Sequence, residues 1–416
     1  MEKLRDKENV IYCALFIYLI ATSFINQDVY AFTVRYASLI IFLALGVMSL
    51  PYLMEDLKNK DADLLMAFLV VVLAAVFVLV TNSGYGAMFI PSDLALICYM
   101  SKHMKPGSRD IAVLSFAGAS PVILWYSHVR WSYNFNMAGF SFMLMAFFGM
   151  ILIEEVFGRE ISDNGNLRHI NADSISSLHK TMVMHRGFIE GIIFLTAFIL
   201  SMLYHSRTAM FGMLMFLIVY FVLCIMSTKI GLPGINEVKS GSNGIKWLCK
   251  FIFLLASVGA VLFTYVYIKL ADAFGEVILL YKDIFSGRQA IWQELWGAFL
   301  SSPITGIGSA YELKSFDIFE VHNGLFDILT VHGIIVFALI IVMLWRMFER
   351  ACGQGAGNVW SLHNIRKTYR IKNIAISAAF AMMFTSYFEN FFTVPPYSII
   401  FMTYILIAKS ENKNTG

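Results

Sequence analysis

Hydrophobic residues in this chain gather into blocks of roughly 17 to 22 residues, separated by short polar segments. Blocks of this length match α-helices that cross the hydrocarbon core of a bilayer. We therefore expect an all-α polytopic membrane protein with about twelve transmembrane helices. The expected spans are 10–26, 34–53, 64–80, 86–101, 111–127, 137–153, 187–204, 208–226, 247–268, 324–345, 373–389 and 396–408.

The composition agrees with this pattern. Of the 416 residues, 58% are hydrophobic and only 14% are charged, whereas soluble proteins carry about 25% charged residues. An ordinary soluble enzyme is therefore excluded. The net charge of +3 is too small to indicate a nucleic-acid partner.

The basic residues indicate the orientation, because loops rich in Lys and Arg stay on the cytoplasmic side. With the N-terminus inside, 24 of the 31 basic residues fall in inner segments. The first apolar block lacks a small-residue cleavage pattern, so we interpret it as an uncleaved helix. We expect both termini to be cytoplasmic. The outer basic residues are Arg35, Arg130, Arg207, Lys269, Lys282, Arg288 and Lys314.

The cysteines predict no disulfide framework. All of them lie near the inner ends of expected spans or in inner loops, on the reducing side of the membrane. They are Cys13, Cys98, Cys224, Cys249 and Cys352.

Within one integral membrane domain covering 1–416, residues 269–323 form the largest expected outer loop. Part of this loop has apolar residues at helical spacing, which predicts an amphipathic helix at the outer interface or over a cavity. Arg288 falls on its apolar side, facing protein or lipid, and Gln289 and Gln293 take the opposite face. The apolar residues are Ile284, Ile291, Trp292, Leu295, Trp296 and Phe299.

Two outer arginines, Arg207 after Ser206 and Arg288 after Gly287, open apolar helical segments. Each is by itself typical of an interfacial arginine that reaches lipid phosphates. Together they also suit an anionic substrate, because guanidinium groups match phosphate oxygens in a bidentate manner. The segment 303–308, with Gly306 and Gly308, is interpreted as a turn that ends the amphipathic helix, since neither a strand nor a Lys-Ser/Thr pair flanks it.

His322 precedes Asn323 at the outer mouth of the tenth span, and a histidine can act as a general base near neutral pH. A structural histidine at the interface is the competing interpretation, and we interpret His332 inside the span as a packing residue. His322 lacks a companion ligand at helical spacing other than nearby carboxylates, so we expect no metal site. The carboxylates that stay open as alternative bases are Glu312, Asp317, Glu320 and Asp327.

A further outer loop, residues 125–133, contains Trp125, Arg130 and Trp131. Such aromatic residues are typical of the belt at the membrane interface. Stacking of a sugar on either tryptophan is the alternative.

In this order the motifs resemble the O-antigen ligase and polymerase superfamily, whose members are membrane glycosyltransferases acting on undecaprenyl-linked glycans. The resemblance covers about residues 187–345. It lies in Ser206-Arg207-Thr208-Ala209, in Gly287-Arg288 with Trp292, Pro303 and Gly306-Ile307-Gly308, and in His322-Asn323 with nine residues before Gly333.

The resemblance implies a GT-C-like enzyme of the bacterial cytoplasmic membrane that inverts the anomeric centre and needs neither metal nor cofactor. Arg207 and Arg288 would bind the pyrophosphate of an undecaprenyl-linked donor, and His322 would assist the acceptor hydroxyl. Supporting roles fall to Ser206, Asn323, Trp292 and Arg130. The implied partners are the lipid-linked glycan, the bilayer and a chain-length regulator.

The resemblance leaves the acceptor open. Ligases of the superfamily tend to have Gly, Thr or Tyr three residues after the motif glycine, where this chain has Val336. This favours a polymerase of repeat units over a ligase that joins the glycan to lipid A core or protein. A lipid-linked oligosaccharide flippase is a third alternative, but we would then expect similar halves and ionisable residues deep in several spans.

Overall fold

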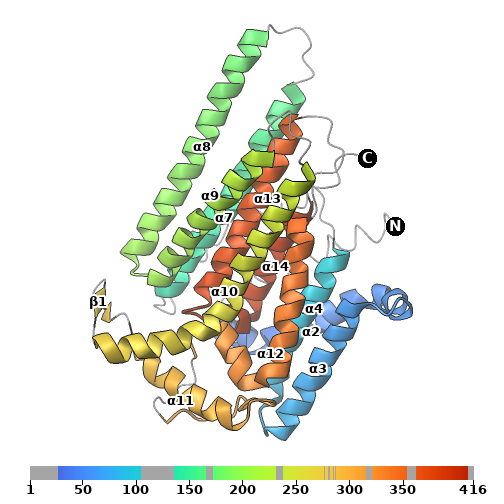
Figure 1. The fold of residues 1–416 in the computed structure, drawn as a ribbon, viewed down its shortest axis with the longest axis vertical. Coiled ribbons are helices and arrows are strands. Elements are labelled where there is room, and N and C mark those ends of the chain that lie inside the picture. Colours follow the sequence, from blue (N-terminus) through green and yellow to red (C-terminus); the bar gives the residue numbers. More distant parts are fainter. Residues whose placement is uncertain are drawn as a thin grey trace.

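The computed structural model describes residues 27–104, 135–164, 172–230, 238–275, 277–279, 282–283, 285, 287–314, 321–353 and 362–410. These residues form an almost entirely helical bundle in which long helices run up and down, as Figure 1 shows. The shorter helix α11 lies across one end of the bundle. The predicted fold class, an all-α polytopic membrane protein, is confirmed.

The long helices lie where the apolar blocks predict them. They are α2 (Gln27–Lys58), α3 (Ala62–Val80), α4 (Phe89–His103), α7 (Phe135–Asn164), α8 (Ala172–Leu203), α9 (Arg207–Ile230), α10 (Val238–Phe274), α12 (Gly324–Gly353), α13 (Leu362–Thr385) and α14 (Pro395–Ser410). The remaining elements are α11 (Arg288–Ser301), the 3-10 helices η1 (Tyr85–Met88) and η2 (Phe391–Thr393), and strands β1 (Ile278–Leu279) and β2 (Lys282–Asp283). The strands pair antiparallel, with Ile278 opposite Asp283.

Among the described residues, seven helices are long and apolar enough to cross a membrane. They lie within α2, α3, α7, α8, α9, α10 and α12. Helix α4 has only 15 residues, about 22 Å at 1.5 Å per residue, and the apolar part of α14 is also short. The predicted spans 10–26 and 111–127 fall outside the described residues, so the number twelve stays a prediction.

Two helix boundaries differ from the predicted ones, and one helix has a kink that was not predicted. Helix α13 ends at Thr385 rather than at residue 389, and a turn follows before η2. Helix α10 continues to Phe274, so the outer loop begins later than residue 269. Helix α12 is kinked at Gly333, where φ is 80° and ψ is 170°. That the whole chain forms one membrane domain stays a prediction.

The middle of the bundle is packed with aromatic and aliphatic side chains from α4, α12, α13 and α14. Phe348 of α12 stacks on Phe380 of α13 at 4.5 Å between ring centroids, and Phe401 of α14 packs against the same ring. Large apolar residues such as Phe68 on α3 and Phe221 on α9 are exposed around the perimeter. This distribution is expected where lipid covers the outside of a bundle.

The two ends of the bundle are named here by their contents. The α11 end holds residues 81–88, 204–206, 287–314, 321–323 and 386–394. These were predicted on the outer side, except that 86–88, 204 and 386–389 were placed in spans. The Arg350 end lies opposite and holds residues 59–61, 102–104 and 346–353, where Lys and Arg are frequent.

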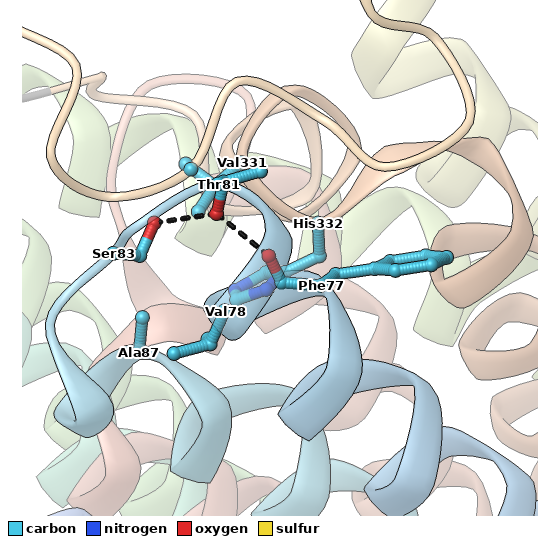
Figure 2. Close-up of a pocket in the computed structure, with 8 residues that line it drawn as sticks. Phe77, Val78, Thr81, Ser83, Ala87, Val331 and His332 are labelled. Atoms are coloured by element: carbon cyan, nitrogen blue, oxygen red, sulfur yellow. Dashed lines mark hydrogen bonds between the residues drawn. The ribbon is translucent and has the colours of Figure 1, made fainter.

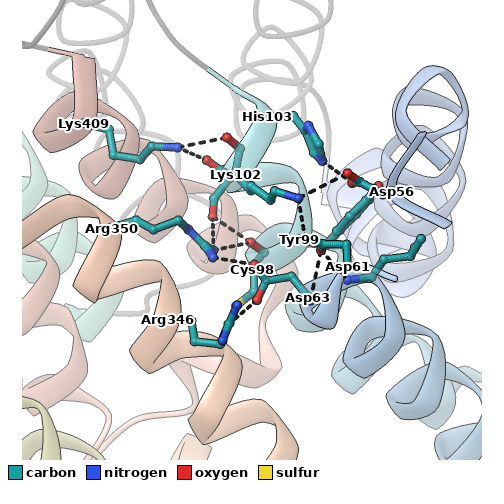
Figure 3. A network of polar contacts seen from close by, with 12 residues as sticks. Asp56, Asp61, Asp63, Cys98, Tyr99, Lys102, His103, Arg346, Arg350 and Lys409 are labelled. Atoms are coloured by element: carbon teal, nitrogen blue, oxygen red, sulfur yellow. Dashed lines mark hydrogen bonds and ion pairs between the residues drawn. The ribbon is translucent and has the colours of Figure 1, made fainter. Parts of the chain in front are cut away.

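A dense set of ion pairs closes the Arg350 end (Figure 3), and we call it the Asp63 network. The buried Asp63 carboxylate is bound by Arg346 at 2.5 Å and by Arg350 at 2.7 Å, both from α12. Lys102 lies 2.6 Å from Asp61. These contacts join α3, α4 and α12. The network consists of Asp56, Asp61, Asp63, Lys102, His103, Arg346 and Arg350. Beside it, Lys409 donates to the Ser101 main-chain carbonyl.

A second buried set of charges joins α7, α8 and α13. Glu154, whose side chain is fully buried, pairs with Arg186 at 3.0 Å and with Arg370 at 2.7 Å. Arg370 also binds Glu190 at 2.8 Å. Glu154, Arg186 and Glu190 lie near the ends of the candidate spans rather than at their midpoints.

Candidate functional site

Arg207 is the first residue of α9, at the α11 end. The chain turns between α8 and α9 at His205, which has a φ of 53°. Ser206 is fully buried and lies so close to Gly139 of α7 that a Cβ there would come within 2.1 Å of the serine Cβ. Ser206 and Gly139 therefore fix the start of α9, which places Arg207 at the rim of the bundle.

Arg288 opens α11 after Gly287, which has a φ of 77°. The predicted apolar face of this helix is confirmed, with four of its residues buried, and Trp296 and Phe326 rings lie 5.0 Å apart. The Arg288 guanidinium lies 5.9 Å from the Phe388 ring centroid, and its side chain is only 15% exposed. Arg288 thus faces protein, which is one of the two surroundings, protein or lipid, that the sequence predicted for it. The buried residues are Ile291, Trp292, Leu295 and Phe299.

Two details of the predicted helix need correction. Gln293 is exposed as predicted, but Gln289 is partly buried, and among the described residues its Oε1 atom has no hydrogen-bond partner. Ile284 precedes the first residue of α11 and is not among the residues that the structure describes. Gln289 follows Arg288, which brings it toward the interior at the first turn of the helix.

The turn at 303–308 joins α11 to the kink of α12. The N–H groups of Ile307 and Gly308 donate to the carbonyls of Thr330 and Val331, and the Ile334 N–H donates to the Pro303 carbonyl. These bonds satisfy backbone groups that the kink removes from the helix. The predicted turn is confirmed, and its position is fixed by main-chain contacts.

Glycine is required on both sides of this contact. Gly306 has a φ of 77°, and a Cβ there would lie 2.3 Å from the Val331 carbonyl oxygen. A Cβ at Gly333 would lie 2.0 Å from the Ile304 carbonyl oxygen. Only residues without a Cβ allow the two backbones to approach this closely.

Figure 2 shows the neighbouring hollow, in which Thr81 and Ser83 share a hydrogen bond of 2.8 Å. The Ser309 N–H also donates to the Ser83 hydroxyl, so the turn docks on the end of α3. His332, interpreted from the sequence as a packing residue, is buried and lines this hollow.

His322 lies between α11 and α12 with a φ of 53°, a conformation rare for residues with a Cβ. Its neighbours hold it from both sides. The Trp292 indole N–H donates to the Val321 carbonyl at 2.6 Å. The Asn323 side chain accepts from the Phe326 N–H, which caps α12, and donates to the Ala260 carbonyl of α10. Trp292 and Asn323 therefore act on His322 through the backbone.

Glu389 brings the separated motifs together. Its carboxylate lies 3.8 Å from Arg288 and 4.0 Å from His322 Nδ1. The Thr208 hydroxyl, one residue after Arg207, donates to it at 3.5 Å. Residues far apart in the sequence thus converge on one partly buried carboxylate, whose side chain is 17% exposed.

The Glu389 backbone is fixed as well. Its carbonyl accepts from the Gly324 N–H at 3.1 Å, and a Cβ at Gly324 would lie 3.0 Å from the Phe392 nitrogen. The sequence did not predict a role for Glu389, because residue 389 ends the apolar block 373–389. The signal that could have identified it is a Glu-Asn pair inside an apolar stretch shortly before Pro395.

Other sequence candidates lie elsewhere. Arg130, Trp125 and Trp131 fall outside the described residues, as do Asp317 and Glu320. Glu312 is exposed, and Asp327 lies in the first turn of α12. Within the described part of the chain, His, Cys, Asp and Glu nowhere form a group of three or more that could hold a metal ion.

A family model described as O-antigen ligase matches residues 192–341. The matched region contains Arg207, Arg288 and His322 and stops before Glu389. Comparisons with curated proteins and with solved structures gave no match. The predicted resemblance to the O-antigen ligase and polymerase superfamily is confirmed over residues 192–341.

Proposed function

We propose that this protein is a membrane glycosyltransferase that transfers a glycan from undecaprenyl pyrophosphate to an acceptor hydroxyl at the α11 end. The observation that supports this most is the convergence of the Arg288, Thr208 and His322 segments on Glu389. One site can then bind an anionic leaving group and accept a proton. The glycan transfer needs both functions.

The reaction is a single displacement. The acceptor oxygen attacks the anomeric carbon, and the bond from that carbon to the pyrophosphate oxygen breaks with its electron pair going to the pyrophosphate. Arg207 and Arg288 stabilise the negative charge that develops there. The acceptor proton goes to His322, whose Nδ1 is turned to Glu389, so that Nε2 is the accepting nitrogen. Attack from the opposite face inverts the anomeric centre.

We place the α11 end outside the cytoplasmic membrane and the Arg350 end inside. The support is the excess of Lys and Arg at the Arg350 end. Both termini would then be cytoplasmic. A single cysteine replacing the exposed Leu300 of α11, in a chain without native cysteines, should react with a membrane-impermeant maleimide in intact cells. A cysteine replacing Leu57 should react only after the cells are opened.

The repeat-unit polymerase is our first candidate activity, supported by Val336 at the position where ligases tend to have Gly, Thr or Tyr. The ligase is the second, favoured by the description of the matching family model. Purified protein in nanodiscs, supplied with lipid-linked repeat units alone, should form longer chains if it is a polymerase. A requirement for lipid A core or protein as acceptor would identify the ligase.

Arginine variants test the site itself. Arg207→Ala or Arg288→Ala should lower transfer by about 100-fold or more, as loss of one charge-stabilising donor does in other enzymes. Lys314→Ala is the matched control, because Lys314 is an exposed outer-loop cation and its loss should leave transfer unchanged. Wild-type activity in Arg288→Ala would refute the pyrophosphate assignment. Translocation of labelled donor lipid without any transfer would favour the flippase.

A further inference from the structure

We propose that Glu389 is a positioning residue. In the empty site its carboxylate neutralises Arg288, and once a pyrophosphate has replaced that carboxylate on Arg288, Glu389 supports His322. The inference rests on the proposed function and deepens it. It assigns a role to a residue outside the matched family region.

The first argument is the placement of the two carboxylate oxygens. Oε1 faces Arg288 Nη2 at 3.8 Å and accepts from the Thr208 hydroxyl at 3.5 Å. Oε2 faces His322 Nδ1 at 4.0 Å. A single carboxylate therefore lies between the cation proposed to bind the leaving group and the imidazole proposed to take the proton.

The contacts of Glu389 with Arg288 and His322 are longer than hydrogen bonds between charged groups. Hydrogen bonds between charged groups are typically about 2.7–2.9 Å long, so Glu389 is within ion-pair distance of both partners but hydrogen-bonded to neither. Asp63 at the opposite end binds Arg346 and Arg350 at 2.5 and 2.7 Å. Arg288 is held loosely by comparison, which lets another anion compete for its N–H groups.

A bound pyrophosphate would change the balance of charges around Glu389. A pyrophosphate on Arg288 brings negative charge close to Glu389, and like charges near one cation weaken each other's binding. His322 is then a favourable partner for Glu389, because its imidazole becomes positive when it accepts the acceptor proton. The Glu389 main-chain carbonyl accepts a hydrogen bond from the Gly324 N–H at 3.1 Å, and this keeps the Glu389 carboxylate within reach of His322.

Glu389→Gln tests the role, because it keeps the size of the side chain and removes its charge. Binding of undecaprenyl pyrophosphate without sugar should become about fivefold tighter, since a competing anion is lost. The turnover number for glycan transfer should fall about 100-fold, because the His322 imidazolium loses its counter-charge. Tighter binding with slower turnover is a combination that loss of structure does not produce.

Two further variants complete the test. Glu389→Asp keeps the charge and should recover a large part of the turnover, with donor affinity close to that of the wild type. Asp272→Asn is the matched control, because Asp272 is an exposed acid on α10 and should change neither quantity. Thermal unfolding in the same nanodiscs should show that all variants are folded.

The outcomes separate this inference from the proposed function. If the wild type neither binds undecaprenyl pyrophosphate nor transfers glycan, the proposed function fails. If the wild type is active and Glu389→Gln binds the donor more weakly, or turns over at the wild-type rate, the role of Glu389 is overturned while the proposed function stands.

Discussion

The two ends of the bundle hold their charged side chains in different ways. At the Arg350 end, Asp56, Asp61 and Asp63 each bind a basic partner at 2.5–2.7 Å. At the α11 end, Glu389 approaches Arg288 and His322 only to 3.8 and 4.0 Å. Closely paired ions use most of their hydrogen-bonding capacity on each other. Arg288, whose carboxylate partner lies 3.8 Å away, keeps that capacity for a ligand.

The backbone shows the opposite contrast. The α11 end is fixed by main-chain hydrogen bonds and by residues with positive φ, among them His205, Gly306, His322 and Gly333. Such conformations cost about 1–3 kcal/mol each for a residue with a Cβ and tend to occur at functional sites. A rigid backbone beside a loosely held Arg288 suits substrate binding, whereas close ion pairs suit the joining of helices.

The largest expected effect compares one histidine from each end. His322→Ala should lower glycan transfer by about 100-fold to 10,000-fold with little change in the melting temperature, because the side chain is 30% exposed. His103→Ala should lower the melting temperature, since His103 binds Asp56 at 2.7 Å and stacks on Tyr52. Transfer rates and thermal unfolding measured on both proteins check this. A His322→Ala variant with wild-type transfer activity would contradict the assignment of a catalytic histidine to the α11 end.

Asp63→Asn should destabilise the fold by about 3 kcal/mol, because it leaves Arg346 and Arg350 without their buried counter-charge. Turnover per folded molecule should stay at the wild-type value, since Asp63 binds Arg346 and Arg350 at the Arg350 end and not the residues around Glu389. Unfolding in detergent and transfer assays measure the two quantities. A fall in turnover without loss of stability would mean that the Arg350 end takes part in the reaction.

Gly306→Ala should destabilise the protein by about 2 kcal/mol through backbone strain, because its Cβ would press on the Val331 carbonyl. The control is Gly297→Ala in the exposed part of α11, where nothing lies within 4 Å of the added Cβ. That substitution should stabilise the protein by about 0.5–1 kcal/mol. Equal melting temperatures for the two variants would show that the contact between the turn and the kink is dispensable.

The smallest expected effect is a pH dependence at the Arg350 end. Burial acts to raise the pKa of the Asp61 carboxyl, but hydrogen bonds from Lys102 and the Leu64 N–H outweigh it and hold that pKa below its usual value. The resulting stability is present above about pH 3.9 and is lost as the pH falls through the lowered pKa. Partial exposure limits it to about 1 kcal/mol or less. Asp61→Asn should therefore lose less stability than the wild type on acidification.

The sequence predicted the parts of the molecule that depend on local patterns. Apolar blocks located helices such as α3 and α9 to within a few residues, and helical spacing identified the buried face of α11 with Trp292 and Leu295. Of the proposed site residues, Arg207, Arg288 and His322 were found because charge is scarce on the outer side and because their motifs resemble a known family.

The sequence missed Glu389 and the partial burial of Gln289 because both depend on where a helix begins or ends. A hydropathy block continues through residue 389, but the turn after Thr385 is set by contacts of Gly324 and Asn323 with that segment. The kink at Gly333 is similar, since its lost hydrogen bonds are replaced by the turn at 303–308.

The sequence by itself determined that the chain is a helical membrane protein, which ends of its helices carry charge, and which outer arginines and histidine could carry chemistry. Only the tertiary structure decided that Arg288, His322 and the Thr208 hydroxyl next to Arg207 meet at Glu389. The physical reason is the distance along the sequence over which each interaction acts. Hydrophobic periodicity acts between neighbours along one helix, whereas an ion pair between residues 288 and 389 depends on the packing of α9, α11, α12 and α13 around it.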